Sequence, residues 1–514
     1  MKTPRFLFAL LLICGVLPLS AQTKIFIDTK SGTETISRHI YGHFSEHLGR
    51  CIYDGLWVGK NSAIPNINGF RQEAVAALLE IGIPNLRWPG GCFADIYHWQ
   101  DGIGDPKKRP PILNYHWGNV TEDNSFGTHE FLELCELLNC EPYLAANVGT
   151  GTPRELKDWV QYVNASGTSP MTQLRARNGR AAPWAVKYWG IGNEVWGCGG
   201  NMEAEYYAKL YNHYATFCRD YDDTRCVRIA CGPYGGDTTW TATLLKHINR
   251  GLLQGISIHY YTVARGDWAK KGSATLFGEE EWFEQLSATL KMEEAVEQNS
   301  RIMDRYDPRK EIALIVDEWG NWYDVEPGTN GGFLYQQNSL RDALAAAINF
   351  NIFNNHCGRV RMANIAQTVN VLQSVALTRG SELVRTPTFY AFKLFRPHAD
   401  ATLLPSRIEP AVYSFNGKSI PAVTVSASKD KTGAIHISLT NADPKTSQEI
   451  VCDLQGFSPE HVQGKIITAE AISAFNEFGK PEAVNIQPFD GERIFGNKIL
   501  FSLPAKSVVM LEVR

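Results

Sequence analysis

The sequence predicts an α/β fold, a (β/α)8 TIM barrel followed by a C-terminal all-β sandwich domain. The chain has 514 residues, which is enough for two or three domains. Between residues 36 and 395, apolar runs of strand length alternate with stretches of helical period, and from residue 396 onward the pattern changes to period-two alternation. Eight strands with crossover helices over roughly 360 residues fit a closed barrel better than an open sheet.

The predicted barrel strands are eight short apolar runs. They lie at 39–46, 84–88, 142–147, 186–194, 227–232, 256–261, 312–318 and 360–366. Apolar residues at helical spacing predict helices between them at 69–81, 127–138, 153–163, 202–221, 239–249, 279–306 and 333–355. Asn68 and Thr152 are candidate N-caps, and Pro153 follows Thr152 at the first helical position.

Residues 396–514 predict a β-sandwich. The alternating runs lie at 422–428, 434–440, 449–454, 464–469 and 499–503, with a turn-like segment at 429–433. Residues 22–35 form an N-terminal segment whose alternating part, 23–28, we expect to join the β domain. All thirteen tryptophans lie between Trp57 and Trp322, which favours structural support over sugar binding for the β domain.

Residues 1–21 have the composition of a secretory signal peptide. Two basic residues, Lys2 and Arg5, precede an apolar run at 6–17, and small residues follow near Ala21. The run is too short to span a bilayer. The sequence therefore predicts an exported protein, periplasmic or extracellular, without a membrane span.

The composition excludes several classes of partner. Fifty basic and fifty-four acidic residues give a formal net charge of −4 without a Lys/Arg-rich run, so nucleic acid is not an expected partner. The eleven cysteines include no CxxC pair, so neither a metal nor another cofactor is expected. Cys218, Cys226 and Cys231 are close enough in sequence for one disulfide, with buried free thiols as the alternative.

Polar residues follow most of the predicted barrel strands. In a (β/α)8 barrel the reacting groups lie at the C-terminal ends of the strands. The fifth run ends without an evident functional residue. The other seven end in Glu46, in Arg87 with Cys92 just beyond, in Asn147, in Asn193 and Glu194, in His259 and Tyr261, in Asp317 and Glu318, and in Gln367.

Two of these glutamates suggest glycoside hydrolysis. The runs before Glu194 and Glu318 are apolar. Because a carboxylate is costly to bury without a partner, two carboxylates at one rim of the barrel indicate that they have a function. Glycosidases need such a pair, because one carboxyl protonates the leaving oxygen while the other attacks carbon or activates water. The alternative is that either glutamate only pairs with a base such as Arg87.

Six spaced segments carry a family resemblance. They are YGHFSEHLGRCIYDG from Tyr41, LRWPGGCFADIYHWQDGIG from Leu86, WGIGNEVWG from Trp189, SIHYY from Ser257, VDEWGNWY from Val316 and MANIAQTVNVL from Met362. In this order, and with the β domain, they resemble glycoside hydrolase family 51 over nearly the whole chain. The resemblance implies an exo-acting, retaining α-L-arabinofuranosidase that releases terminal arabinofuranose from arabinan, arabinoxylan or their oligosaccharides.

Carried over residue by residue, the resemblance implies a role for each matching position. Glu194 becomes the general acid/base and Glu318 the nucleophile, with carboxyls about 5–5.5 Å apart as retention requires. Asn193 becomes the partner of the sugar 2-hydroxyl. The remaining residues of the sugar subsite would be Glu46, Arg87, Cys92, Tyr261 and Gln367, with His259 beside them.

Some features stay open at this point. Many family members have Asn where this chain has Cys92, and we expect Cys92 to be a reduced thiol in the pocket. Trp99, Trp196 and Trp322 either shape the pocket or only pack. The alternatives to an exo-acting enzyme are an endo-β-glycanase on the same scaffold and an inactive glycan-binding protein, although a binder has no need for both glutamates. The family resemblance is compatible with a homo-oligomer but identifies no interface.

Overall fold

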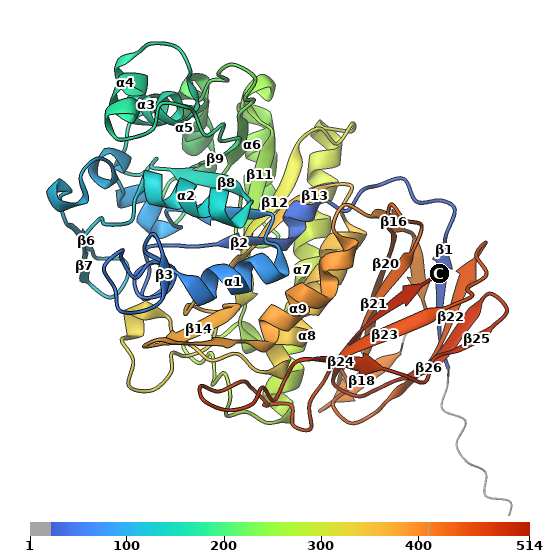
Figure 1. The fold of residues 1–514 in the computed structure, drawn as a ribbon. Coiled ribbons are helices and arrows are strands. Elements are labelled where there is room, and N and C mark those ends of the chain that lie inside the picture. Colours follow the sequence, from blue (N-terminus) through green and yellow to red (C-terminus); the bar gives the residue numbers. More distant parts are fainter. Residues whose placement is uncertain (1–21, 410) are drawn as a thin grey trace, which may run out of the picture.

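The computed structural model of the protein describes residues 22–409 and 411–514, and its centre is a closed barrel of eight parallel strands (Figure 1). The strands follow one another around the barrel in chain order, as βα repeats require. Their bounds are β2 (Gly42–Phe44), β5 (Asn85–Trp88), β8 (Glu141–Ala146), β9 (Tyr188–Ile191), β10 (Val227–Ala230), β11 (Gly255–Thr262), β12 (Ala313–Asn321) and β13 (Val360–Ala366). The predicted fold class is confirmed.

Helices surround the barrel, and all seven predicted ones are present. They are α1 (Gln72–Ile81), α2 (Thr128–Leu138), α3 (Pro153–Asn164), α5 (Ala204–Phe217), α6 (Thr238–His247), α7 (Glu279–Tyr306) and α8 (Leu340–Asn355). Thr152 caps α3, because its side chain accepts a hydrogen bond from the Glu155 amide. The prediction of Asn68 as an N-cap is wrong. Asn68 has a φ of +53° in the turn between two short strands, and α1 begins only after Arg71.

Two helices were not predicted from the sequence. Helix α4 (Pro170–Arg177) is short and polar, so it carries no apolar stripe. Helix α9 (Pro387–Phe395) is buried around almost its whole circumference, so it shows no amphipathic period. The loops contain short antiparallel strand pairs. These are β3 (Asn66–Ile67) with β4 (Phe70–Arg71), β6 (Ile112–Asn114) with β7 (Val120–Glu122), and β14 (Ala376–Arg379) with β15 (Glu382–Arg385).

The C-terminal domain consists of two packed sheets. The six-stranded sheet has the order β16 (Thr402–Leu404), β20 (Val423–Lys429), β21 (Ile435–Asn441), β27 (Ser507–Val513), β23 (Val462–Ile467) and β24 (Ile486–Phe489). The five-stranded sheet has the order β17 (Ser406–Ile408), β1 (Thr23–Asp28), β22 (Gln448–Gln455), β26 (Lys498–Leu503) and β25 (Arg493–Phe495). A separate hairpin pairs β18 (Val412–Phe415) with β19 (Lys418–Pro421).

The N-terminal strand β1 belongs to this domain although the barrel separates the two in sequence. It pairs in parallel with β22 and antiparallel with β17. Figure 1 shows the blue strand β1 among the orange and red strands of the domain.

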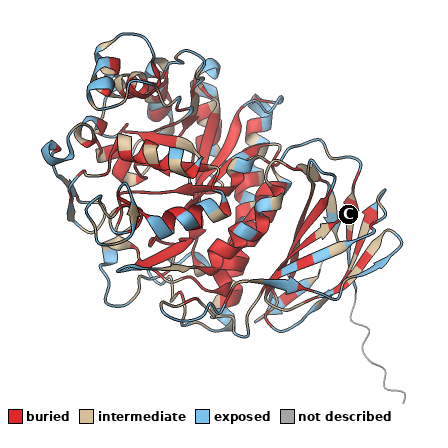
Figure 2. Cartoon of the chain, in the orientation of Figure 1, coloured by how far each residue is buried: buried red, intermediate tan, exposed pale blue. Residues whose placement is uncertain are grey.

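The β domain packs on the barrel through helix α8. Every residue of α8 from Leu340 to Asn354 is buried, as the red helix between the two domains in Figure 2 shows. Polar contacts fix the interface, since Asn351 donates to Thr424 Oγ1 and accepts from Ser438 Oγ. The β domain therefore covers an apolar and amide-bearing face that the barrel alone would expose.

The predicted signal peptide, residues 1–21, lies outside the described residues. Among the helices of residues 22–409 and 411–514, none combines the length and apolar character that a membrane crossing requires.

Candidate active site

A cavity of about 450 Å³ lies at the C-terminal ends of the barrel strands. Its polar wall contains six of the predicted site residues, Glu46, Cys92, Glu194, Tyr261, Glu318 and Gln367. The other three are buried: Arg87 bonds Glu318, His259 bonds Glu194, and Asn193 accepts a hydrogen bond from Arg87. The barrel thus brings together all nine residues to which the family resemblance gives a role.

Glu318, in the C-terminal half of β12, is held by three side chains. Its Oε1 accepts a hydrogen bond from Arg87 Nη1 at 2.8 Å, and its Oε2 accepts one from the Tyr261 hydroxyl at 2.7 Å. His259 Nδ1 lies 3.4 Å from the same Oε2. A Cβ atom on Gly91 would lie 2.7 Å from Oε1, so the loop after β5 needs glycine at this position. Donors to both oxygens fix the orientation of the Glu318 carboxyl group.

Arg87 links the ends of three strands. Besides Glu318, its guanidinium donates to Asn193 Oδ1 at 2.7 Å and lies 3.6 Å from Asp317 Oδ2. Burial alone would raise the pKa of Asp317, but the charges of Arg87 and His259 outweigh it and lower that pKa to about 2. Arg87 and His259 therefore compensate the two buried acids of β12, Asp317 and Glu318.

Glu194 follows β9 in a tight turn. Gly192 has a φ of +96°, and Glu194 itself has a φ of +37°, a region that non-glycine residues seldom adopt and that is enriched at functional sites. The turn points the Glu194 side chain at His259, whose Nδ1 lies 2.9 Å from Glu194 Oε1. The side chain of Glu194 is 18% exposed and that of Glu318 only 6%.

His259 lies between the two glutamates. Ligand atoms of Glu194, His259 and Glu318 all fall within 4.8 Å of one another, so an oxygen of each carboxyl approaches the other within that distance. His259 Nε2 contacts Asp317 Oδ1 at 3.1 Å, so both ring nitrogens face carboxylates. Burial would lower the pKa of His259, but these carboxylates raise it to about 10. The imidazolium form fits this position, because only that form donates from both nitrogens.

Glu46, which follows β2, is enclosed by hydrogen-bond donors. Its Oε1 accepts from the amides of Gly91 and Phe93 and from Trp117 Nε1, and its Oε2 accepts from Gln367 Nε2 at 3.0 Å. Burial and the charge of Glu318 raise the pKa of Glu46 to about 7 against the effect of these donors. The cage fixes the Glu46 and Gln367 side chains against each other at the cavity wall.

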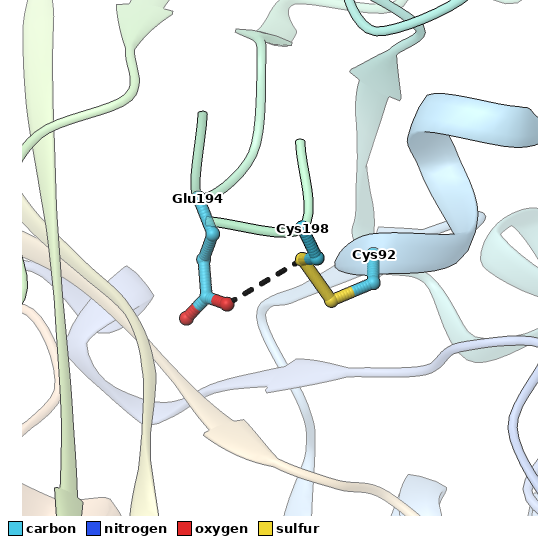
Figure 3. Close-up of side chains that lie close together, drawn as sticks. All are labelled: Cys92, Glu194 and Cys198. Carbon is cyan, nitrogen blue, oxygen red and sulfur yellow. Dashed lines mark hydrogen bonds between the residues drawn. A yellow bond between two sulfur atoms is a disulfide. The ribbon is translucent and has the colours of Figure 1, made fainter. Parts of the chain in front are cut away.

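The expectation for Cys92 is wrong, because Cys92 forms a disulfide with Cys198 (Figure 3). The partner lies 106 residues further along the chain, but the loops after β5 and β9 meet at the barrel mouth, with the two Cα atoms 5.5 Å apart. This is an ordinary separation for a disulfide. No sequence spacing signals such a pair. Cys218, Cys226 and Cys231 are buried free thiols.

The rest of the cavity wall is mostly aromatic. Trp196 and Trp322 line the cavity, whereas Trp99 lies elsewhere and stacks on Trp159 with ring centroids 6.0 Å apart. Sequence reasoning missed Trp117, Tyr234, Trp268, Leu48, Leu334 and Leu372, which also line it. These residues lie in loops rather than at strand ends, so the strand-end rule does not find them.

Asn147, the polar residue after β8, forms hydrogen bonds with backbone groups and does not line the cavity. Its Oδ1 accepts from the amides of Thr150 and Gly151, and its Nδ2 donates to the Tyr97 carbonyl. The residue therefore shapes the loop before α3.

Three groups of potential metal ligands occur within the described parts of the chain. One is Glu194, His259 and Glu318, whose atoms already bond one another. The second is Cys92, Glu194 and Cys198, where the disulfide occupies both sulfurs. The third, Glu293, Glu297 and His356, lies outside the cavity wall, on α7 and at the end of α8.

Comparisons with known proteins agree with this geometry. Residues 77–279 match the family model of the α-L-arabinofuranosidase 1 domain, and residues 317–507 match that of the α-L-arabinofuranosidase C-terminal domain. An intracellular exo-α-L-arabinofuranosidase of Bacteroides ovatus is 49% identical over 499 residues, which cover 96% of this chain and 97% of the relative. The α-L-arabinofuranosidase C of Emericella nidulans is 32% identical over 87% of this chain and 90% of its own.

Solved structures give the same result. The crystal structure of a family 51 arabinofuranosidase from Xanthomonas axonopodis pv. citri is similar with a TM-score of 0.94 and 47% identity, covering 96% of this chain and all of that one. An α-L-arabinofuranosidase from Thermotoga maritima, solved as an arabinose complex, gives 0.83 and 30% over 96% of this chain and 99% of that one.

One prediction is corrected by these relatives. The chain was expected to be exported, but the Bacteroides ovatus relative, which aligns over 96% of this chain, is named an intracellular enzyme. That name points away from export. The prediction depended on the composition of a short N-terminal run alone, and hydropathy there does not identify a compartment.

Proposed function

The chain belongs to the α-L-arabinofuranosidases of glycoside hydrolase family 51, and we propose that it is an exo-acting, retaining enzyme. Its substrates would be the terminal α-L-arabinofuranose units of arabinan, arabinoxylan or their oligosaccharides. In this proposal residues 36–395 are the catalytic barrel, and residues 396–514, with the N-terminal strand, are a supporting domain. The observation that carries the proposal is the close approach of the Glu194 and Glu318 carboxyls beside His259.

Glu318 is the nucleophile in this proposal. Its two oxygens accept from Arg87 and Tyr261, and these donors fix its orientation, as attack on an anomeric carbon requires. Attack on the arabinofuranosyl carbon forms a glycosyl ester on Glu318 while the glycosidic oxygen leaves.

Glu194 is the general acid and then the general base. It delivers a proton to the leaving oxygen in the first step and removes one from water in the second. Its carboxyl is the more exposed of the two, so it can reach the leaving group and the incoming water. An oxygen of each carboxyl lies within 4.8 Å of the other, which supports retention, since inversion needs about 6.5–9.5 Å to accommodate a water.

The sugar subsite would use the residues around the two glutamates. Asn193 Oδ1 accepts from Arg87 and its Nδ2 contacts Cys198 Sγ at 4.0 Å. The second N–H of Nδ2 remains available as a donor to the sugar 2-hydroxyl. Glu46 and Gln367 present their caged side chains to the cavity, together with Tyr261 and Cys92. Because Cys92 is bridged to Cys198, it offers the sugar a weakly accepting sulfur instead of a thiol donor.

Exo action is supported by the bulky side chains around the site. Bulky side chains from separate loops surround the glutamates, including Trp117, Trp268, Trp322 and Leu334. The cavity volume of about 450 Å³ lies within the usual range of small-molecule pockets. Incubation with arabinan and arabinoxylan oligosaccharides should release arabinose alone. A ladder of shorter oligosaccharides would favour the endo-acting alternative.

The stereochemistry of the reaction tests the mechanism directly. Proton NMR of a reaction with an aryl α-L-arabinofuranoside should detect the α-anomer of arabinose as the first product, before mutarotation. A β-anomer appearing first would exclude the covalent intermediate on Glu318.

A further inference from the structure

The turn that carries Glu194 also carries a disulfide sulfur. Cys198 lies four residues after Glu194, and its Sγ is 3.6 Å from Glu194 Oε2 (Figure 3). The other sulfur comes from Cys92, at the start of the 3-10 helix Cys92–Ile96 that follows β5. A disulfide sulfur has no proton, so this contact is a hydrogen bond only when Glu194 itself carries the proton and donates it.

These three residues form a compact set of soft and hard ligands. One atom each from Cys92, Glu194 and Cys198 lies within 4.8 Å of the other two, and all three side chains are partly exposed. Cys92 and Glu194 line the cavity, so small solutes in the cavity reach them. Among the described residues, His259 is the cationic side chain that pairs with Glu194, and it does so through Oε1, which leaves Oε2 facing the sulfur.

We propose that reduction of the Cys92–Cys198 disulfide creates a binding site for a thiophilic divalent cation such as Zn²⁺, made by Cys92, Cys198 and Glu194. A small dithiol supplies the two electrons and two protons. The disulfide bond breaks, two cysteine thiols form, and the dithiol becomes a cyclic disulfide. Binding of the cation then releases the two thiol protons to water, and both sulfurs bind as thiolates.

The existing geometry is close to what such a cation requires. With Zn–S of about 2.3 Å and Zn–O of about 2.1 Å, a tetrahedral ion holds a sulfur and an oxygen roughly 3.6 Å apart. This is the present separation of Cys198 Sγ and Glu194 Oε2. The two sulfurs need to move to about 3.8 Å apart, which the rotation of two side chains on Cα atoms 5.5 Å apart can supply.

The ligand chemistry selects the class of cation. Two thiolates favour zinc and other thiophilic metals over Mg²⁺ or Ca²⁺, which prefer oxygen ligands. Because the carboxyl of Glu194 is used as a ligand, it can no longer hold or deliver a proton. Inhibition by this route depends on the proposed role of Glu194, whereas binding of the cation does not.

Co²⁺ tests the site spectroscopically. The full chain is reduced with a dithiol under native conditions, freed of reductant without air, and titrated with Co²⁺. Reduced protein should show tetrahedral d–d bands and a sulfur-to-cobalt charge-transfer band that the oxidised protein lacks. The bands should persist in Cys140→Ser, which removes a partly exposed free thiol outside the cavity wall, and disappear in the double variant C92S/C198S.

Zn²⁺ protection provides a second measurement that needs no variant. Iodoacetamide and peptide mapping should label Cys92 and Cys198 in the reduced protein, and Zn²⁺ should protect both. A disulfide that the dithiol does not reduce in the folded protein would overturn the proposal, as would labelling of these two residues indifferent to Zn²⁺.

Glu194→Gln separates this proposal from the catalytic assignment. Loss of one ligand should weaken Co²⁺ binding by more than about tenfold, and unchanged affinity would overturn the three-residue site. In the wild type, Zn²⁺ should abolish turnover of the reduced enzyme, leave the oxidised enzyme unaffected, and be reversed by a chelator. If Zn²⁺ binds through Glu194 but turnover continues, the site stands and the acid/base role of Glu194 fails.

Discussion

The cavities at the two ends of the barrel differ in how deeply their charged side chains are buried. At the C-terminal end, a cavity of about 450 Å³ is built on buried ionic groups, with the side chains of Arg87, Asp317 and Glu318 at most 6% exposed. At the N-terminal end, beside the residues that precede β2, β5 and β8, a cavity of about 960 Å³ is larger. Its charges are at the surface, as in the pair of Arg38 and Asp400, whose side chains are 60% and 28% exposed.

This difference indicates that buried charges that compensate one another mark the reactive site better than the volume of a cavity does. Burying an ion costs several kcal/mol unless partners compensate it, so the network at the C-terminal end is a costly arrangement that indicates a function. At the N-terminal end the fully buried His43 has its pKa lowered to about 3 by burial, and it is therefore neutral. The following predictions test this contrast, starting with the largest expected effect.

Replacing Glu318 by Ala should abolish activity. The nucleophile is lost, so kcat/KM should fall roughly 10⁴-fold or more on natural oligosaccharides and on activated aryl arabinofuranosides alike. Steady-state kinetics and intact-protein mass spectrometry check this, and no glycosyl-enzyme should form. Glu136→Ala, at the N-terminal cavity, is the matched control and should keep full activity. Substantial activity of Glu318→Ala on the activated substrate would refute its assignment as nucleophile.

Replacing Glu194 by Ala should have an effect that depends on the leaving group. On oligosaccharides kcat/KM should fall by about 10²–10⁴-fold, the usual contribution of general acid catalysis. With an activated aryl substrate the first step should survive, the glycosyl-enzyme should accumulate, and azide should restore turnover as an azido sugar. Thermal melting must first show a folded variant. Failure of azide to rescue a folded variant would argue that another group is the acid/base.

Replacing His259 by Asn should reduce kcat/KM roughly 100-fold, as for the loss of one preorganised donor. It should also change the pH dependence of stability. The raised pKa of His259, about 10 against an ordinary 6.5, stabilises the fold fully below pH 6.5, and this stabilisation is lost as the pH rises through 10.

Denaturant unfolding of wild type and His259→Asn at several pH values checks this. The difference in free energy of unfolding should be largest near pH 6 and shrink toward pH 10. A difference that grows with pH would mean that His259 is neutral in the folded enzyme.

Much of the candidate site at the C-terminal end of the barrel could be predicted from the sequence. The eight strands, the residues that end them and the pairing of Glu194 with Glu318 follow from local apolar runs and from the rule that strand ends meet at one rim. The aromatic wall could not be predicted, because Trp117, Tyr234 and Trp268 lie in loops whose course depends on tertiary contacts. The buried helix α9 was not predicted from the sequence because it lacks a polar face.

The Cys92–Cys198 disulfide shows the same limit more sharply. Each cysteine follows a different strand, and only closure of the barrel brings the two Cα atoms to 5.5 Å. The motif around Cys92 indicated correctly that this residue lines the cavity. It carried no information about Cys198, so the prediction of a reduced thiol was wrong.

The smallest expected effect lies at the N-terminal end of the barrel. Asp400 accepts from Arg38 Nε at 2.6 Å, and the two side chains are 28% and 60% exposed. Exposed pairs contribute about 0–1 kcal/mol, so Asp400→Asn should lower the free energy of unfolding by no more than this, and less in high salt because ions screen the pair. Its kcat/KM should equal that of the wild type, since the larger cavity lacks a buried, compensated pair of carboxyls. A folded Asp400→Asn enzyme with clearly reduced kcat/KM would break the contrast between the two ends, because a solvent-exposed pair would then contribute to chemistry at the opposite rim.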